Sequence, residues 1–168
     1  LAYKAALLMK DKYGKGLRGT VKIDILKNIP VAAGLAGGSS NGAAVILGLN
    51  NLWKLNLDVK TMCEIASELG SDVPFTLMGQ AKGNECLGEK INNDSLATTC
   101  ALAVGTGTEM TPLPAIEKNI LLSKPPISVS TAEVYKGMKL DEIESRPDNK
   151  ELIEALKNKD IEGVKKNM

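Results

Sequence analysis

A glycine-rich stretch constrains the fold of this chain more than any other part of its 168 residues. Residues 30–40 read Pro-Val-Ala-Ala-Gly-Leu-Ala-Gly-Gly-Ser-Ser, and glycine readily adopts the positive φ angles that tight turns require. Before it, residues 21–25 alternate apolar and polar side chains, which predicts a half-buried strand. After it, residues 41–53 predict a helix whose buried stripe is formed by Val45, Leu49 and Leu52. The expected order is therefore strand, glycine-rich loop and helix.

This order of elements is suited to binding phosphate groups. Successive backbone N–H groups in a tight turn form a concavity for anions, and the following helix adds its unpaired N–H groups and the positive end of its dipole. Ser39 and Ser40 can cap the helix, donate hydrogen bonds to phosphate oxygens or ligate Mg²⁺. Taken alone, however, a glycine-rich turn more often serves only to connect a strand tightly to a helix.

Two familiar phosphate-binding patterns are excluded. The chain contains no G-x-x-x-x-G-K-[ST], so the loop is not of the Walker A type. Gly105 and Gly107 have the first spacing of G-x-G-x-x-G, but Met110 occupies the position of the third glycine. A dinucleotide-binding fingerprint is therefore also absent from the sequence.

Four segments, in the right order, resemble motifs of the GHMP kinase superfamily. The stretch at residues 30–40 is similar to the ATP-binding motif of these kinases. The other three are LGSDVPF at residues 69–75, GTGTEMTPLP at 105–114 and STAEVY at 130–135. The resemblance covers most of the chain and implies an α+β fold, the two-layer nucleotide domain similar to the second domain of ribosomal protein S5.

The motifs are most similar to those of one branch of the superfamily. That branch uses ATP and Mg²⁺ to phosphorylate the 2-hydroxyl of 4-diphosphocytidyl-2-C-methyl-D-erythritol, in the non-mevalonate route to isoprenoids. The resemblance therefore implies ATP and a small cytidyl molecule as partners. It assigns ATP binding to the residues of the loop: Pro30, Val31, Ala32, Ala33, Gly34, Leu35, Ala36, Gly37, Gly38, Ser39 and Ser40.

Asp72 is the candidate catalytic residue. It follows an amphipathic helix for which Asp58 is the expected N-cap, and an Asp in Gly-Ser-Asp-Val-Pro is by itself more often a turn former. The resemblance implies instead that Asp72 accepts or orients the proton of the attacking substrate hydroxyl. Phosphoryl transfer needs mainly positioning and charge stabilisation, so a base and a loop of N–H donors fit that reaction.

Thr131 and Tyr135 are weaker candidates for substrate binding. The resemblance implies that the aromatic ring of Tyr135 stacks on the cytosine of the substrate. The chain has only five aromatic residues (one Phe, one Trp and three Tyr), so one outside the expected core is notable. The alternative is a half-buried tyrosine with its hydroxyl group satisfied, and the residues alone leave both interpretations open.

The chain also departs from the family pattern. Residues 1–13 already resemble a helix, whereas the family begins with a strand that carries an essential lysine, and the chain has no histidine for the family's cytidine-reading position. A second glycine-rich loop expected late in the family is also absent. We therefore expect an internal fragment of a longer kinase, with little or no activity of its own.

The expected domains are a partial N-terminal GHMP domain at residues 1–124 and the beginning of the C-terminal GHMP domain at 125–168, with a boundary near Pro125. Residues 73–75, 101–104 and 119–123 are expected as strands and 131–138 as a short helix. Residues 80–99 are expected as a long inserted segment, and residues 87–91 partly echo residues 107–110. The segment is a duplicated hairpin, a lineage-specific loop or an artefact of the sequence, and the residues alone leave the three explanations open.

Composition limits the remaining possibilities. With a net charge of +1, nothing in the sequence argues for a nucleic-acid or membrane partner, and it leaves the oligomeric state open. Cys63, Cys86 and Cys100 are odd in number and lack C-x-x-C spacing, so neither a zinc site nor a disulfide framework is indicated. A cytoplasmic location is expected, or a plastid if a preceding segment carried a transit peptide.

Two alternative functions remain at this stage. One is another GHMP small-molecule kinase, acting on a substrate such as homoserine or mevalonate. The D-V-P-F and S-T-x-x-V-Y segments argue against it. The other is a truncated nucleotide-binding module without catalysis, which the departures at both ends of the chain favour.

Overall fold

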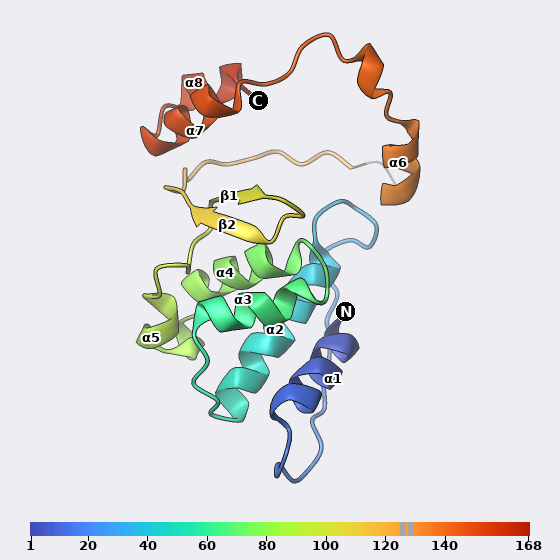
Figure 1. The fold of residues 1–168 in the computed structure, drawn as a ribbon, viewed down its shortest axis with the longest axis vertical. Helices are drawn as coiled ribbons and strands as arrows, with labels where there is room; N and C mark the ends of the chain where they lie inside the picture. Colours follow the sequence, from blue (N-terminus) through green and yellow to red (C-terminus); the bar gives the residue numbers. More distant parts are fainter. Residues whose placement is uncertain (125–126, 128–129) are drawn as a thin grey trace.

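The computed structural model describes residues 1–124, 127 and 130–168. Figure 1 shows the helices of residues 2–83 packed together, with a small sheet next to them. Further along the chain lie short helices at residues 131–137 and 140–142 and, near the C-terminus, a pair of helices. The mixture of helices with a small antiparallel sheet agrees with the expected α+β class.

Helix α1 (Ala2–Tyr13) packs against helix α2 (Gly37–Leu52), and both helices were predicted from the sequence. α2 begins at Gly37 rather than Asn41, so the end of the glycine-rich stretch forms its first turn. The predicted stripe is confirmed only at Leu49, which is buried, because Val45 is half-buried and Leu52 is 64% exposed. Neighbouring helices cover a different face of α2, formed by Ala43, Ile46, Leu47 and Asn50.

Helix α3 (Val59–Ser67) begins and packs as its sequence predicts. Asp58 is its N-cap, and the Asp58 carboxylate accepts a hydrogen bond from the Thr61 N–H at 2.8 Å. Hydrogen bonding from Thr61, first from its side chain and then from its N–H, lowers the pKa of the Asp58 carboxyl group. Of the apolar face expected at Met62, Ile65, Ala66 and Leu69, the first three are buried. Leu69 is half-buried and follows the end of the helix.

Residues 73–75 do not form the expected strand; they are the first turn of helix α4 (Val73–Gly83). Pro74 lies in this first turn, where its missing N–H is tolerated and its fixed φ favours a helix. The residues that follow have helical spacing, and one continuous face is fully buried: Val73, Leu77, Met78 and Ala81. A short apolar run cannot by itself distinguish a buried strand from a helix.

The segment at residues 80–99 is structured rather than a long loop. After the end of α4, it forms the short helices η1 (Glu85–Leu87) and α5 (Glu89–Asn92), so it contains no duplicated hairpin. Asn92 Nδ2 donates to the carbonyl oxygens of Ala81 at 2.7 Å and Asn84 at 2.8 Å. Asp94 accepts from Leu96 N at 2.9 Å, and Ile91 and Ala97 are buried in the core.

Strands β1 (Ala101–Val104) and β2 (Glu109–Pro112) form an antiparallel hairpin. Its turn contains Gly105 and Gly107 at φ angles of 64° and 85°. The remaining elements are α6 (Thr131–Gly137), η2 (Leu140–Glu142), α7 (Asn149–Lys157) and α8 (Ile161–Lys166). The strand expected at residues 101–104 and the helix expected near residue 131 are thus confirmed.

The strands expected at residues 21–25 and 119–123 do not form, although both segments are free of helix. Within the described residues the only sheet is β1 with β2, so neither segment has a neighbour to pair with. Their apolar side chains are accordingly exposed: Ile25 to 48% and Leu121 to 95%. The boundary expected near Pro125 lies outside the described residues.

No helix in the described ranges is long and apolar enough to cross a membrane.

We expect Asp58→Ala to lower the free energy of unfolding by about 1 kcal/mol, because α3 loses its N-cap. Asp58→Asn should retain most of that stability, since asparagine caps helices about as well as aspartate. The lowered folded-state pKa means that the stability contributed by the carboxylate is present above its unfolded pKa and lost as the pH falls through its folded pKa.

Urea unfolding of the wild type and both variants across acidic and neutral pH measures these effects. The wild type should lose more stability on acidification than Asp58→Asn does. Equal stability of all three proteins at neutral pH would contradict the assigned cap.

Candidate phosphate-binding and catalytic site

The loop before α2 has an unusual backbone. Positive φ angles recur at every second residue, with 52° at Ala32, 69° at Gly34 and 48° at Ala36. For alanine this left-handed conformation costs about 1 kcal/mol or more and persists only where the surroundings impose it. Turns of this kind orient successive N–H groups towards one point, which favours an anion there.

The N-terminus of α2 is uncapped by any side chain. Ala36 is its N-cap residue, and neither Ser39 nor Ser40 caps it, so the capping role considered for these serines is excluded. Ser40 N is the first donor inside the helix, to Ala36 O at 2.8 Å, which leaves the preceding N–H groups without an intrahelical acceptor. With no acidic residue in the first turn, the positive end of this helix is electrostatically unopposed.

Lys27 adds a cationic group that sequence reasoning did not identify. A Cβ atom placed on Gly37 would lie 3.2 Å from Lys27 Nζ and 2.8 Å from Ile29 Cγ2. The ammonium group therefore lies beside the first residue of α2, and Gly37 permits that close approach. A signal existed in the sequence: Lys27 is in phase with the apolar residues at 21, 23 and 25 and breaks their alternation.

Asp72 lies at the start of α4, between two other parts of the site. Its neighbour Ser71 contacts the β1–β2 turn, because a Cβ on Gly107 would be 3.5 Å from Ser71 Cβ. Its other neighbour, Val73, contacts α2, because a Cβ on Gly42 would be 3.7 Å from Val73 Cγ1. The tertiary structure thus brings the turn that carries Asp72 against both α2 and the hairpin.

The Asp72 side chain is exposed and does not cap α4. Only its main-chain oxygen is engaged, accepting from Thr76 N at 3.1 Å. Within the described residues, no hydrogen bond or ion pair of its carboxylate is found, so the turn-forming alternative, in which the carboxylate bonds to nearby N–H groups, has no support. The carboxylate is available to a hydroxyl group of a bound molecule.

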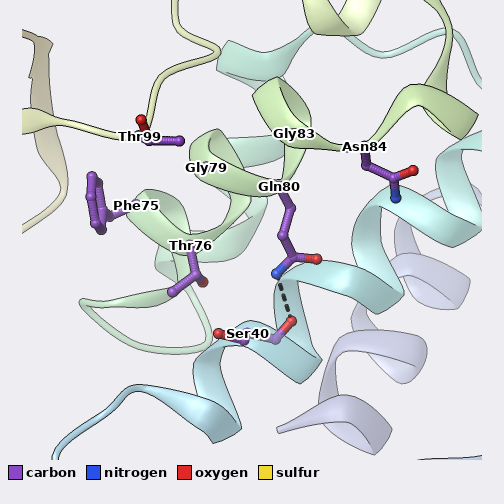
Figure 2. A pocket seen from close by; sticks show the side chains of 8 residues that line it. All are labelled: Ser40, Phe75, Thr76, Gly79, Gln80, Gly83, Asn84 and Thr99. Carbon is purple, nitrogen blue, oxygen red and sulfur yellow. Dashed lines mark hydrogen bonds between the residues drawn. The ribbon is translucent and has the colours of Figure 1, made fainter. Parts of the chain in front are cut away.

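A cavity of about 470 Å³ lies beside the start of α2 and along α4. Figure 2 shows Gln80 pointing from α4 to α2, where its Nε2 donates to Ser40 O at 2.9 Å. The other residues that line the cavity are Phe75, Thr76, Gly79, Gly83, Asn84 and Thr99. Of the site residues predicted from the sequence, Ser40 is the one that lines this cavity in the described structure.

The two weaker candidates lie on α6, for which the described residues show no hydrogen bond or ion pair to the loop or to Asp72. Tyr135 lies on α6 and is 70% exposed. Figure 1 shows α6 set apart from the helices of residues 2–83. Thr131 begins α6, and its side chain lies outside the described part of the structure.

Neither a metal cluster nor an activated thiol accompanies the site. In the described residues, no group of three or more acidic or cysteine side chains could hold a metal ion. Burial raises the pKa of Cys63 to about 12, and its thiol contacts Pro74 O at 3.7 Å in the first turn of α4. Cys63 is therefore a packing residue under α4.

The N-terminal half of the chain is similar to a known family. Residues 1–80, which contain the loop, Lys27 and Asp72, match the family model of the GHMP kinases N terminal domain. The resemblance seen in the sequence motifs is therefore confirmed, and the chain is related to the GHMP kinases.

Three bacterial relatives sharpen this relationship; each is named 4-diphosphocytidyl-2-C-methyl-D-erythritol kinase. The chain is 45% identical over 168 residues to that of Clostridioides difficile, covering all of this chain and 50% of the relative. It is 44% identical over 169 residues to that of Acetivibrio thermocellus, covering all of this chain and 52% of the relative. For Bacillus subtilis the identity is 44% over 162 residues, 96% of this chain and 49% of the relative. The chain thus spans about half the length of the relatives it matches.

Replacing either of two adjacent glycines at the start of α2, Gly37 or Gly38, by alanine should have different effects on the free energy of unfolding. In Gly37→Ala the new methyl group would meet Ile29 at 2.8 Å, so we expect a loss of about 1–3 kcal/mol in the free energy of unfolding. In Gly38→Ala the nearest atom is Leu1 Cδ1 at 3.5 Å, an ordinary contact, so helix propensity should leave stability equal or slightly higher. Thermal unfolding without nucleotide measures both, and equal losses would contradict the close approach at Gly37.

Proposed function

We propose that this chain supplies the ATP-binding half of a kinase that phosphorylates the 2-hydroxyl of 4-diphosphocytidyl-2-C-methyl-D-erythritol. The observation that carries the proposal is the juxtaposition of an uncapped helix N-terminus, with Lys27 beside it, and the exposed carboxylate of Asp72 on an adjoining turn. The names of the relatives supply the substrate. Isoprenoid biosynthesis by the non-mevalonate route is the corresponding pathway.

Each part of the site has a distinct proposed role. The loop residues 30–40 and the first turn of α2 hold the phosphates of ATP through backbone N–H groups. Lys27 offsets their negative charge. Asp72 orients the substrate hydroxyl and accepts its proton as the phosphoryl group is transferred. Thr131 and Tyr135 remain candidates for the cytidyl end of the substrate.

The donor set of the loop fits a nucleotide triphosphate with its accompanying Mg²⁺. The hydroxyl groups of Ser39 and Ser40 do not cap α2, so they are the ligands that this segment offers to the ion. Mg²⁺ would neutralise charge on the transferred phosphoryl group. We further propose that residues 1–124 contribute to the two-layer nucleotide domain similar to the second domain of ribosomal protein S5, and residues 125–168 to the C-terminal GHMP domain.

A chimera tests the substrate assignment. This chain would replace the aligned half of the Clostridioides difficile kinase, and ADP release would be measured with the cytidyl substrate, homoserine and mevalonate. We expect turnover with the cytidyl substrate alone. A folded chimera that binds ATP but phosphorylates homoserine or mevalonate instead would favour a different GHMP kinase, and one that phosphorylates none would overturn the catalytic proposal.

Asp72→Asn in that chimera should lower kcat by about 10²–10⁴-fold, because the general base is lost. The dissociation constant for ATP should change little, since Asp72 lies on α4 rather than in the loop. The expected result is a strongly reduced kcat with an unchanged affinity for ATP. Near-normal kcat in a folded Asp72→Asn protein would remove Asp72 from the mechanism.

Lys27→Met should weaken ATP binding by about tenfold or more, the usual effect of losing a hydrogen bond to a charged group. Lys22→Met is the matched control on the same segment, because Lys22 is exposed and pairs with Asp24 at 3.2 Å. Isothermal titration of ATP with Mg²⁺ into the isolated chain measures both variants. Equal affinities for Lys27→Met and Lys22→Met would contradict the role of Lys27.

A further inference from the structure

Gln80 links the two halves of the site by a direct polar contact. It lies eight residues beyond Asp72 on α4, about 12 Å further along a helix that rises 1.5 Å per residue. Its Nε2 donates to Ser40 O at 2.9 Å across forty residues of sequence (Figure 2). In the described part of the chain, no other hydrogen bond is found between α2 and α4.

Ser40 is held through both of its peptide groups. Its N–H donates to Ala36 O at 2.8 Å, which closes the first turn of α2, and its carbonyl accepts from Gln80. The N–H groups without an intrahelical acceptor belong to the residues just before it. A shift of Ser40 relative to α4 would therefore move those donors relative to Asp72.

Apolar packing brings α2 and α4 together, and the hydrogen bond adds a directional restraint to their alignment. Ile46, Leu77 and Met78 are fully buried in the core that holds α2 and α4 together, but such contacts have no preferred direction. A hydrogen bond does, because it weakens steeply when its distance or angle changes. Gln80 is only half-buried, so its bond contributes more to the position of the first turn of α2 than to overall stability.

Residues 80–99, the segment that begins with Gln80, contribute to the wall of the cavity beside α2. Residues 80–99 looked like an insertion in the sequence, and their first and last residues, Gln80 and Thr99, both line the cavity beside α2. We propose that Gln80 is a positioning residue that sets the ATP-binding turn of α2 against the helix that carries Asp72. This inference rests on the proposed nucleotide-binding role of the loop.

Gln80→Met and Gln80→Glu test the donor role in the chain as it stands. Methionine keeps the length of the side chain without a donor, and a glutamate carboxylate turns the donor into an acceptor facing a carbonyl. Asn92→Leu is the matched control. Asn92 is also a half-buried carboxamide that donates to main-chain oxygens of α4 and the residue after it, at 2.7 and 2.8 Å, but its bonds do not reach α2.

Three measurements are compared: the thermal midpoint, the affinity for ATP with Mg²⁺ by titration calorimetry, and amide hydrogen exchange of residues 40–44 without nucleotide. Both Gln80 variants should weaken ATP binding by about three- to tenfold, the loss expected for one hydrogen bond, and should speed exchange in residues 40–44. Asn92→Leu should lower the thermal midpoint at least as much, because it loses two hydrogen bonds, with neither of the other effects.

Wild-type affinity and exchange in Gln80→Met or Gln80→Glu would overturn the inference. So would an equal loss of affinity in Asn92→Leu, because the effect would then follow from general destabilisation. If the wild-type chain binds no ATP, the proposed function of the loop fails. The exchange of residues 40–44 in the nucleotide-free variants then still decides whether Gln80 positions α2.

Discussion

The packing of α2 against α4 is the contact on which the rest of the site depends. Ile46 on α2 and Leu77 and Met78 on α4 are fully buried in one core, and Gly42 in α2 lies beside Val73, the first residue of α4. The start of α2 presents uncapped N–H groups with an ammonium beside them, and the start of α4 presents a carboxylate with no protein partner among the described residues. A donor of phosphate and an acceptor hydroxyl need this combination of charges at one place.

Strongly periodic helices could be predicted from the sequence, and strands that depend on a distant partner could not. The cap and apolar face of α3 follow from Asp58 and the residues after it, because these are local interactions within one or two turns. Residues 21–25 have the alternation of a strand, yet a strand also requires backbone groups from elsewhere to pair with. Residues 73–75 were misread because a short apolar run fits either a strand or a buried helix.

The residues of the candidate site also fall into two groups: those that the sequence indicated and those that only the structure revealed. The glycine-rich stretch stood out by its residue types and order, and Asp72 through the resemblance of its segment to a family motif. Gln80 did not, since a glutamine is an ordinary surface residue until the fold shows what its side chain reaches, and Lys27 was visible only as a break in the alternation that begins at residue 21. Residues 80–99 likewise changed from an unexplained insertion into part of the wall beside α2.

The sequence by itself determined the chemistry this chain can offer: a loop able to adopt positive φ, a helix beginning at its end, and one carboxylate after a predictable helix. These are local properties, set by side-chain size and by hydrogen bonds between residues close in the chain. Only the tertiary structure decided which of these groups meet, because the contacts of Gly42 with Val73, of Gly107 with Ser71 and of Gln80 with Ser40 join residues at least thirty positions apart. Burial of a shared apolar core places them together, and no local pattern encodes that arrangement.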